Sequence, residues 1–185
     1  MGMRVTDKYV FFFTDKDVFS NWYVAPFYDK MASKFNPVEA ECGVMFDCVE
    51  QYMMWRKASL FKDYDTASAI LSGVRKRTNE KDQAYYKRMG REVMGYEDSM
   101  WKDCREMVIK RGLFMKYHQN PELKSVLMKY KSKIFVEASP YDAIYGIKMG
   151  MYDQGIEDPS NWKGQNLLGN WHNDLINYFS SKDIY

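Results

Sequence analysis

The chain has 185 residues, of which 46% are hydrophobic and 28% charged, and its formal net charge is +2. These values are typical of one folded domain with a buried core, and they exclude a disordered chain. The small net charge excludes a protein that binds nucleic acid through its overall charge, so a polyanion would have to bind at a local patch. We expect a single domain over residues 1–185, with a core from about residue 9 to residue 179.

Cysteine and histidine are sparse in this chain. The three cysteines, Cys42, Cys48 and Cys104, have no C-x-x-C spacing, which favours reduced thiols and a cytoplasmic protein. The two histidines lie far apart in the sequence, so we expect no zinc site. Carboxylates are the alternative ligands, for Mg²⁺, but no run of alternating acids indicates them. The expectation is no metal and no cofactor. The longest apolar run, residues 9–13, is too short to span a membrane.

The first quarter of the chain predicts short strands and loops. Residues 9–13 are aromatic and β-branched and end at a polar turn, which is typical of a strand. Residues 18–30 are aromatic and predict extended chain with some loop. We expect an exposed loop over residues 31–42 and a second short strand over residues 43–46.

Three helices are predicted next. Asp47 fits an N-cap, with a helix from about residue 48 to residue 60. A second helix begins at Asp63, runs to about residue 71 and ends at Gly73. Thr78 fits the cap of a third helix that extends to about residue 89.

The second half of the chain predicts further helices and two more strands. The longest helix runs from Asp98 to about residue 117, and Pro121 occupies the first position of the next one. Residues 134–136 predict a buried strand, and residues 146–149 predict another. A last helix covers about residues 167–179, and its inward-facing residues are Leu168, Trp171, Leu175 and Tyr178. The predicted fold class is α+β, a mostly helical single domain with a small β-sheet.

Glu50 is the first candidate for chemistry. On the predicted helix it shares a face with Met54 and Lys57, where it would border a cleft. The residues alone favour a structural role, because Asp47-x-x-Glu50 fits a capping box. The two roles are compatible, since a helix N-terminus also binds anions.

Polar and aromatic residues elsewhere suit a nucleotide, and each also has a structural reading. Asn21 can bind ribose hydroxyls or a base edge, or it can form a turn. Trp22, Tyr23 and Trp101 can stack on a base or belong to the core. Lys57 can neutralise a phosphate or be a solvated helix charge.

Two segments in the second half of the chain offer further candidates. Asp142 follows the strand at residues 134–136 in an irregular segment, so it is either a site residue or a turn former after Pro140. The Gly-bounded loop at residues 164–169, which contains Asn166 and Gly169, can offer backbone N–H groups to a phosphate. It lacks the spacing of a P-loop.

A basic run at residues 75–77 is followed by Lys87, Arg88 and Arg91. These charges form either a patch for DNA or phosphate, or a solvated face neutralised by neighbouring acids.

In chain order, these segments resemble the NADAR family, also called YbiA-like. The resemblance covers about residues 9–175. The matching segments are residues 19–23, 26–27, 50–53, 57–58, 61, 70–71, 90–91, 101, 116, 119–120, 127, 137–139, 142, 145–146 and 164–169.

The resemblance implies an N-glycosidase that acts on ribosyl or ADP-ribosyl compounds without a cofactor or metal. In the family, positions matching Glu50, Trp101 and Asp142 are tied to activity, so these three are the expected catalytic residues. The expected substrate-binding residues are Asn21, Trp22, Tyr23, Lys57, Arg91, Gln119, Asn166 and Gly169.

The substrate types that the resemblance implies are ADP-ribose attached to a nucleobase, notably guanine in DNA, and a phosphoribosyl-amino-pyrimidine of riboflavin synthesis. A non-catalytic reader of ADP-ribose or NAD is the rival from another class, and a DNA-associated partner protein is a third reading. The expected partner is thus a nucleotide substrate, which is attached to DNA if the substrate is ADP-ribosylated guanine. We expect no membrane partner.

Three residues depart from the family pattern. Gln51 stands where the family usually has His, Tyr145 where it has Trp, and Gln165 where it has Lys. These changes bear on substrate choice more than on the type of reaction.

Overall fold

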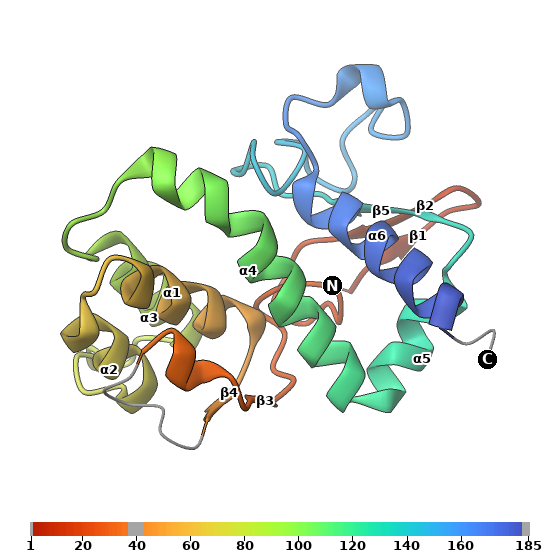
Figure 1. The fold of residues 1–185 in the computed structure, drawn as a ribbon. Coiled ribbons are helices and arrows are strands. Elements are labelled where there is room, and N and C mark those ends of the chain that lie inside the picture. The colour runs from red at the N-terminus through yellow and green to blue at the C-terminus, as the bar shows by residue number, and fades with distance from the viewer. Residues whose placement is uncertain (1, 37–42, 183–185) are drawn as a thin grey trace. The chain divides into compact units, whose positions relative to one another are not determined.

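The computed structural model describes residues 2–36 and 43–182. The chain divides into two compact units (Figure 1). Unit 1 comprises Met1–Tyr23 and Pro121–Tyr185, and unit 2 comprises Val24–Asn120. Unit 2 is therefore inserted, in sequence, between the two segments of unit 1.

Unit 1 is a three-stranded sheet packed against a helix. Its strands are β1 (Arg4–Val5), β2 (Tyr9–Phe12) and β5 (Ile134–Glu137), in the order β1-β2-β5. β1 pairs antiparallel with β2, and β2 pairs parallel with β5 in the register Tyr9↔Ile134. All four β2 residues are buried, which explains its unbroken apolar sequence.

Helix α6 (Leu167–Lys182) packs on β5, and α5 (Pro121–Lys129) precedes that strand (Figure 1). The core between them is aromatic. The His172 ring stacks on Phe135 with centroids 5.7 Å apart, and Phe19 meets Phe135 edge-on at 4.8 Å. His172 thus belongs to the core of unit 1.

Unit 2 is built around α1 (Val49–Leu60). Ten of the 12 residues of α1 are buried, because α2 (Tyr64–Ser72), α3 (Asp82–Arg91) and α4 (Asp98–Gln119) all pack on it. Strands β3 (Phe27–Asp29) and β4 (Val44–Phe46) form an antiparallel pair. A short 3₁₀ turn covers Ala32–Lys34.

The predicted α+β fold class is confirmed, and most helices lie where the sequence places them. Asp63 caps α2 by accepting a bond from the Thr66 N–H, and Gly73 ends it in the left-handed conformation. Residues 37–42 of the predicted loop, with Cys42, lie outside the described residues.

Several local predictions were wrong. Helix α3 begins after Lys81 rather than Thr78, and residues 146–149 form bends instead of a strand. Tyr178 is exposed, although the helical pattern placed it inward. Strand β1 was missed because two residues give no periodicity to detect.

Candidate functional site

The predicted site residues are divided between the two units. Unit 2 holds Glu50, Lys57, Arg91, Trp101 and Gln119. Unit 1 holds Asn21, Trp22, Tyr23, Asp142, Asn166 and Gly169.

At the start of α1, the residues that were expected to cap the helix do not do so. The N-cap is Cys48 rather than Asp47, and its side chain makes no cap bond. Gln51, at the third helical position, accepts a hydrogen bond from the Asp47 N–H at 2.7 Å, and its amide lies 3.4 Å from the Ile70 carbonyl. The capping box expected of Asp47 and Glu50 is therefore wrong, since Gln51 makes the back-bond.

Glu50 lies in the first turn of α1 with 5% of its surface exposed. A carboxylate at this position interacts favourably with the positive end of the helix dipole. Lys57, two turns further on, is half-buried, and burial lowers the pKa of its ammonium group. Asp98 and Glu50 oppose that shift through their negative charge. Glu50 and Lys57 thus lie on one face of α1, where the carboxylate and the ammonium group attract each other.

Residues near the start of α4 complete the surroundings of Lys57. Its ammonium donates to the Gly90 carbonyl at 2.6 Å and lies 4.0 Å from the centre of the Tyr96 ring. The Tyr96 hydroxyl donates to Asp98 at 2.9 Å. Sequence reasoning missed Tyr96 and treated Asp98 only as a helix start, because neither belongs to a motif.

Trp101 and Arg91 flank this group in the sequence. Trp101 is buried on α4, three residues after Asp98, and so lies on an adjoining position of the same helix surface. Arg91 is the last residue of α3, directly after Gly90, and is exposed. Unit 2 therefore gathers a carboxylate, an ammonium group, a phenol and an acid around one face of α1.

A second pair of ionisable groups is buried beside the N-terminus of α1. Lys116 on α4 is fully buried, and burial lowers the pKa of its ammonium group to about 7. Burial raises the pKa of the Cys48 thiol to about 12. Each group lies within electrostatic reach of the other, and the charge of Lys116 favours the Cys48 thiolate.

Asp142 in unit 1 has a structural role at one of its oxygens. Its Oδ1 accepts hydrogen bonds from the Ile144 N–H at 2.7 Å and from the Tyr145 N–H at 2.9 Å. This is the turn-forming arrangement typical of Asp. The carboxylate shapes the loop that follows, which leaves Oδ2 as the oxygen for any chemistry.

The Gly-bounded loop is attached to β5 by Asn166. The Asn166 amide donates to the Phe135 carbonyl and accepts from the Glu137 N–H, both at 2.9 Å. At Gly169, an added Cβ would lie 2.1 Å from the Phe135 carbonyl oxygen. Both residues hold the start of α6 against the sheet, which supplies a packing reason for them apart from substrate binding.

Gln119 has a similar structural role in unit 2. Its side-chain amide accepts from the Tyr28 N–H and donates to the Tyr28 carbonyl, both at 2.8 Å. It thus extends the pairing edge of β3 in the way that a neighbouring strand would.

The segment around Asn21 lies in unit 1. Asn21 is buried, and within the described part of the chain its Oδ1 has no hydrogen-bond partner. Trp22 and Tyr23 are partly exposed, and the Trp22 N–H donates to the Ser20 hydroxyl at 3.1 Å. A buried acceptor of this kind suits a hydroxyl donor.

The basic run after Gly73 is largely neutralised by acids. Arg88 pairs with Glu80 at 2.8 Å and with Glu92 at 3.0 Å, and Lys76 pairs with Asp82 at 2.5 Å. These contacts favour the solvated face over a patch for DNA.

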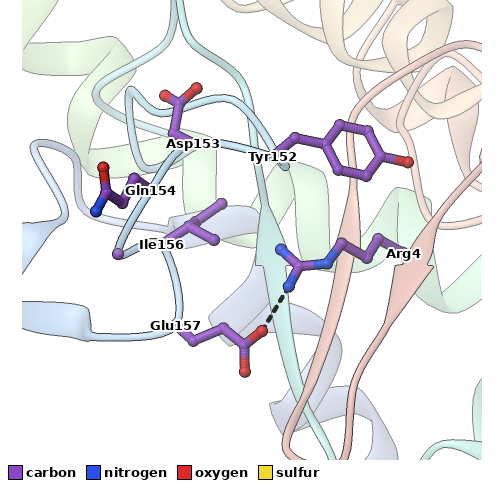
Figure 2. A pocket seen from close by; sticks show the side chains of 7 residues that line it. Arg4, Tyr152, Asp153, Gln154, Ile156 and Glu157 are labelled. Atoms are coloured by element: carbon purple, nitrogen blue, oxygen red, sulfur yellow. Dashed lines mark hydrogen bonds and ion pairs between the residues drawn. The ribbon is translucent and has the colours of Figure 1, made fainter.

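An open hollow of about 460 Å³ lies elsewhere in unit 1 and is lined by Arg4 and residues 152–157 (Figure 2). Arg4 forms an ion pair there with Glu157 at 2.5 Å and donates a hydrogen bond to the Met151 carbonyl at 2.8 Å. None of the predicted site residues lines it. Over the described residues, no group of three or more His, Cys, Asp or Glu side chains is placed to hold a metal ion, and no helix has the length and apolar character to cross a bilayer.

The sequence matches the NADAR domain over residues 10–175. The protein belongs to the NADAR family. Among its NADAR-like relatives, Protein irg-1 of Caenorhabditis elegans is 34% identical over 168 residues, which cover 89% of this chain and 76% of that protein. N-glycosidase R617 of Acanthamoeba polyphaga mimivirus is 33% identical over 171 residues, covering 89% and 92%.

The fold has a counterpart among solved structures. The NMR structure of the E. coli protein YbiA matches with a TM-score of 0.67 and 22% identity, over 98% of this chain and 90% of that one. The resemblance to the NADAR family drawn from the sequence is confirmed, together with the α+β fold.

Proposed function

We propose that this NADAR protein is an N-glycosidase that hydrolyses the N-ribosyl bond of an ADP-ribosyl or phosphoribosyl compound. Its family and its similarity to a protein named N-glycosidase support the reaction type. The favoured substrate is ADP-ribose attached to a nucleobase such as guanine in DNA, which the sequence resemblance suggests.

The observation that carries the proposal is the position of Glu50. Cleavage of an N-ribosyl bond passes through an oxocarbenium-like state, which needs a nearby carboxylate and an activated water. Glu50 is buried at the start of α1, and Gln51 makes the capping back-bond there. The proposal assigns Glu50 to stabilising the developing cation or activating the water.

The remaining roles follow from the chemistry of each side chain. Trp101 stacks against the base or walls the site, and Asp142 orients or transfers a proton through Oδ2. Asn21 meets ribose hydroxyls through its buried carbonyl oxygen. Lys57 and Arg91 meet phosphates.

The phosphate role of Lys57 agrees with its contacts. An ammonium group has three donors, and the Gly90 carbonyl accepts one of them.

The test compares two glutamates at the same helix position. Glu50 and Glu122 are each the second residue of their helices, α1 and α5, but Glu122 is exposed. Wild type, Glu50→Gln and Glu122→Gln are incubated with ADP-ribosylated guanine in DNA, with NAD, and with a ribosylamino-pyrimidine phosphate, and the released sugar is quantified by mass spectrometry.

We expect wild type and Glu122→Gln to turn over one of the three compounds at equal rates. Removing a positioned acid or base should slow Glu50→Gln by about 10²–10⁴ without lowering its melting temperature. Full activity in a folded Glu50→Gln protein would refute the assignment. A tight wild-type complex without turnover would replace the enzyme with an ADP-ribose or NAD reader.

A further inference from the structure

Two arginines and one carboxylate lie around Tyr52 in unit 2. Arg56 on α1 and Arg111 on α4 lie near Asp29 of β3, and the aromatic rings of Tyr52 and Phe35 lie between and beside them. Arg56 follows Glu50 by six residues, which is about 9 Å along the helix axis and on a different face. This arginine cluster is therefore separate from the group around Glu50.

Arg111 takes both oxygens of Asp29. Its Nη2 lies 2.5 Å from Oδ1 and its Nε lies 3.2 Å from Oδ2. The Tyr52 hydroxyl also approaches Oδ2 at 3.4 Å, and the Met31 N–H donates to Oδ1 at 2.9 Å. Asp29 is buried and is fully engaged by these four donors.

Among the residues that the structure describes, Arg56 has no such counter-ion. The residue is buried, with 8% of its surface exposed, and its Nη1 donates to the Tyr52 hydroxyl at 3.1 Å. The guanidinium carbon lies 3.3 Å from the centre of the Phe35 ring. Over the described residues, no carboxylate lies within 4 Å of Arg56, and its buried Nε donates to nothing.

Counted over residues 2–36 and 43–182, the arginine cluster has one more positive charge than negative charges. A guanidinium group keeps its proton at any ordinary pH, and a buried charge is costly unless an opposite charge accompanies it. Arg88, whose side chain is 18% exposed, shows how such a charge is usually balanced, because it pairs with the carboxylates of Glu80 and Glu92. Arg56 is more deeply buried than Arg88, and within the described part of the chain its partners are one hydroxyl and two aromatic rings.

We propose that the arginine cluster is a binding site for a phosphate group. Stacking on Phe35 leaves the donors of Arg56 in the plane of the guanidinium, and its Nε and Nη2 form the edge that pairs with two oxygens of one anion. Arg111, whose side chain is 35% exposed and whose charge is balanced by Asp29, belongs to the same cluster. The proposal stands whether or not the protein is a glycosidase.

The experiment measures unfolding of the whole chain against inorganic phosphate, with chloride at equal ionic strength as the reference. A ligand that binds only the folded state raises the melting temperature, and the rise grows with the logarithm of the ligand concentration once that concentration exceeds Kd. We expect phosphate to stabilise wild type beyond chloride. Arg56→Met, which keeps the alkyl stem over Phe35, should bind phosphate at least about tenfold more weakly, because it loses the charge-assisted bonds.

Two further variants control the comparison. Arg75→Met removes an exposed arginine outside the cluster and should leave phosphate binding unchanged. Arg56→Lys keeps the charge but loses the two-donor edge, so it should also bind more weakly, and it gives a result if Arg56→Met does not fold. Equal stabilisation of wild type and the folded Arg56 variants, or no stabilisation of wild type beyond chloride, would overturn the proposal.

Two more ligands distinguish the source of the phosphate. If ADP-ribose stabilises wild type more than Arg56→Met, while ribose stabilises neither, the site takes the phosphates of a nucleotide. If inorganic phosphate alone behaves in this way, the site takes the free anion.

Discussion

Polar residues are used differently at the start of α1 in unit 2 and in the loop between β5 and α6 in unit 1. At α1, Glu50 and Lys57 are buried or half-buried charges, and Gln51 beside them makes the capping bond. In the loop, the side chains of Asp142 and Asn166 form hydrogen bonds with backbone N–H and C=O groups.

The comparison separates two reasons for a residue to match a family pattern. The loop residues hold a backbone shape, and their hydrogen bonds account for their identity. The charges on α1 are costly to bury, and the side chain that bonds back to the Asp47 N–H there is Gln51 rather than Glu50. We therefore look for chemistry first at α1 and for positioning first in the loop.

The largest expected effect concerns the loop. Replacing a helical glycine by alanine usually stabilises a helix, but at Gly169 the added Cβ meets the Phe135 carbonyl oxygen. We expect Gly169→Ala to lower the free energy of unfolding by about 3 kcal/mol, measured by urea denaturation. Asn170→Ala, at the exposed next position of α6, should leave that free energy nearly unchanged. A stable Gly169→Ala protein would break the assignment of the loop to packing.

The next effect separates charge from shape at Asp142. Asparagine keeps an oxygen that can accept from the Ile144 and Tyr145 N–H groups, whereas alanine does not. We expect Asp142→Asn to retain the stability of wild type but to lose about 10²-fold in glycosidase rate, since it cannot transfer a proton.

The alanine variant at the same position completes the test. Asp142→Ala should lose the rate and also about 1–2 kcal/mol of stability, because two backbone donors lose their acceptor. If the asparagine variant keeps its full rate, Asp142 only positions the loop, and unit 1 contributes no charge to the reaction.

The smallest effect is a pH dependence that should come from unit 2. The pKa of Lys116 is about 7 in the folded chain and 10.5 ordinarily, so from pH 7 upward the unfolded chain holds a proton that the folded chain has lost. Stability should therefore rise with pH, by up to about 1.4 kcal/mol per pH unit.

This rise in stability ends near pH 9. Above that pH the unfolded chain loses the Cys48 thiol proton, whereas the folded chain keeps it because burial raises the pKa of the thiol, so this group then lowers stability as the pH rises. Urea unfolding between pH 7 and pH 9 should show the rise in wild type and in Lys110→Met, an exposed-face control on the same helix. Lys116→Met should show little of it. An equal rise in all three proteins would assign the pH dependence to other groups.

Much of the fold was predictable because the signals are local. The run at residues 9–13, the Asp63 cap and the Gly73 terminus each specify their element without tertiary information. The start of α3 was not predictable, since Thr78 is a good cap by residue type, yet the helix begins at Lys81 without a side-chain cap bond.

The candidate site was predictable as a set of residues but not as a set of roles. The sequence cannot tell that Gln51 rather than Glu50 bonds back to the Asp47 N–H, because both are suitable acceptors one position apart. It also gives no sign that Tyr96 lies beside Lys57 or that Arg56 stacks on Phe35. Those contacts join segments that are distant in the sequence, and only packing defines them.

The parallel pairing of β2 with β5 has a consequence for the order of folding during synthesis. Phe12 ends β2 and Ile134 begins β5, and all of unit 2 lies between them. At about 5–20 residues per second, the roughly 120 intervening residues take about 6–24 s to add, so the nascent β2 strand must wait that long for its neighbour. Unit 2 is contiguous and can collapse during this interval. The apolar N-terminal strand is thus the segment of the growing chain that most needs protection from aggregation.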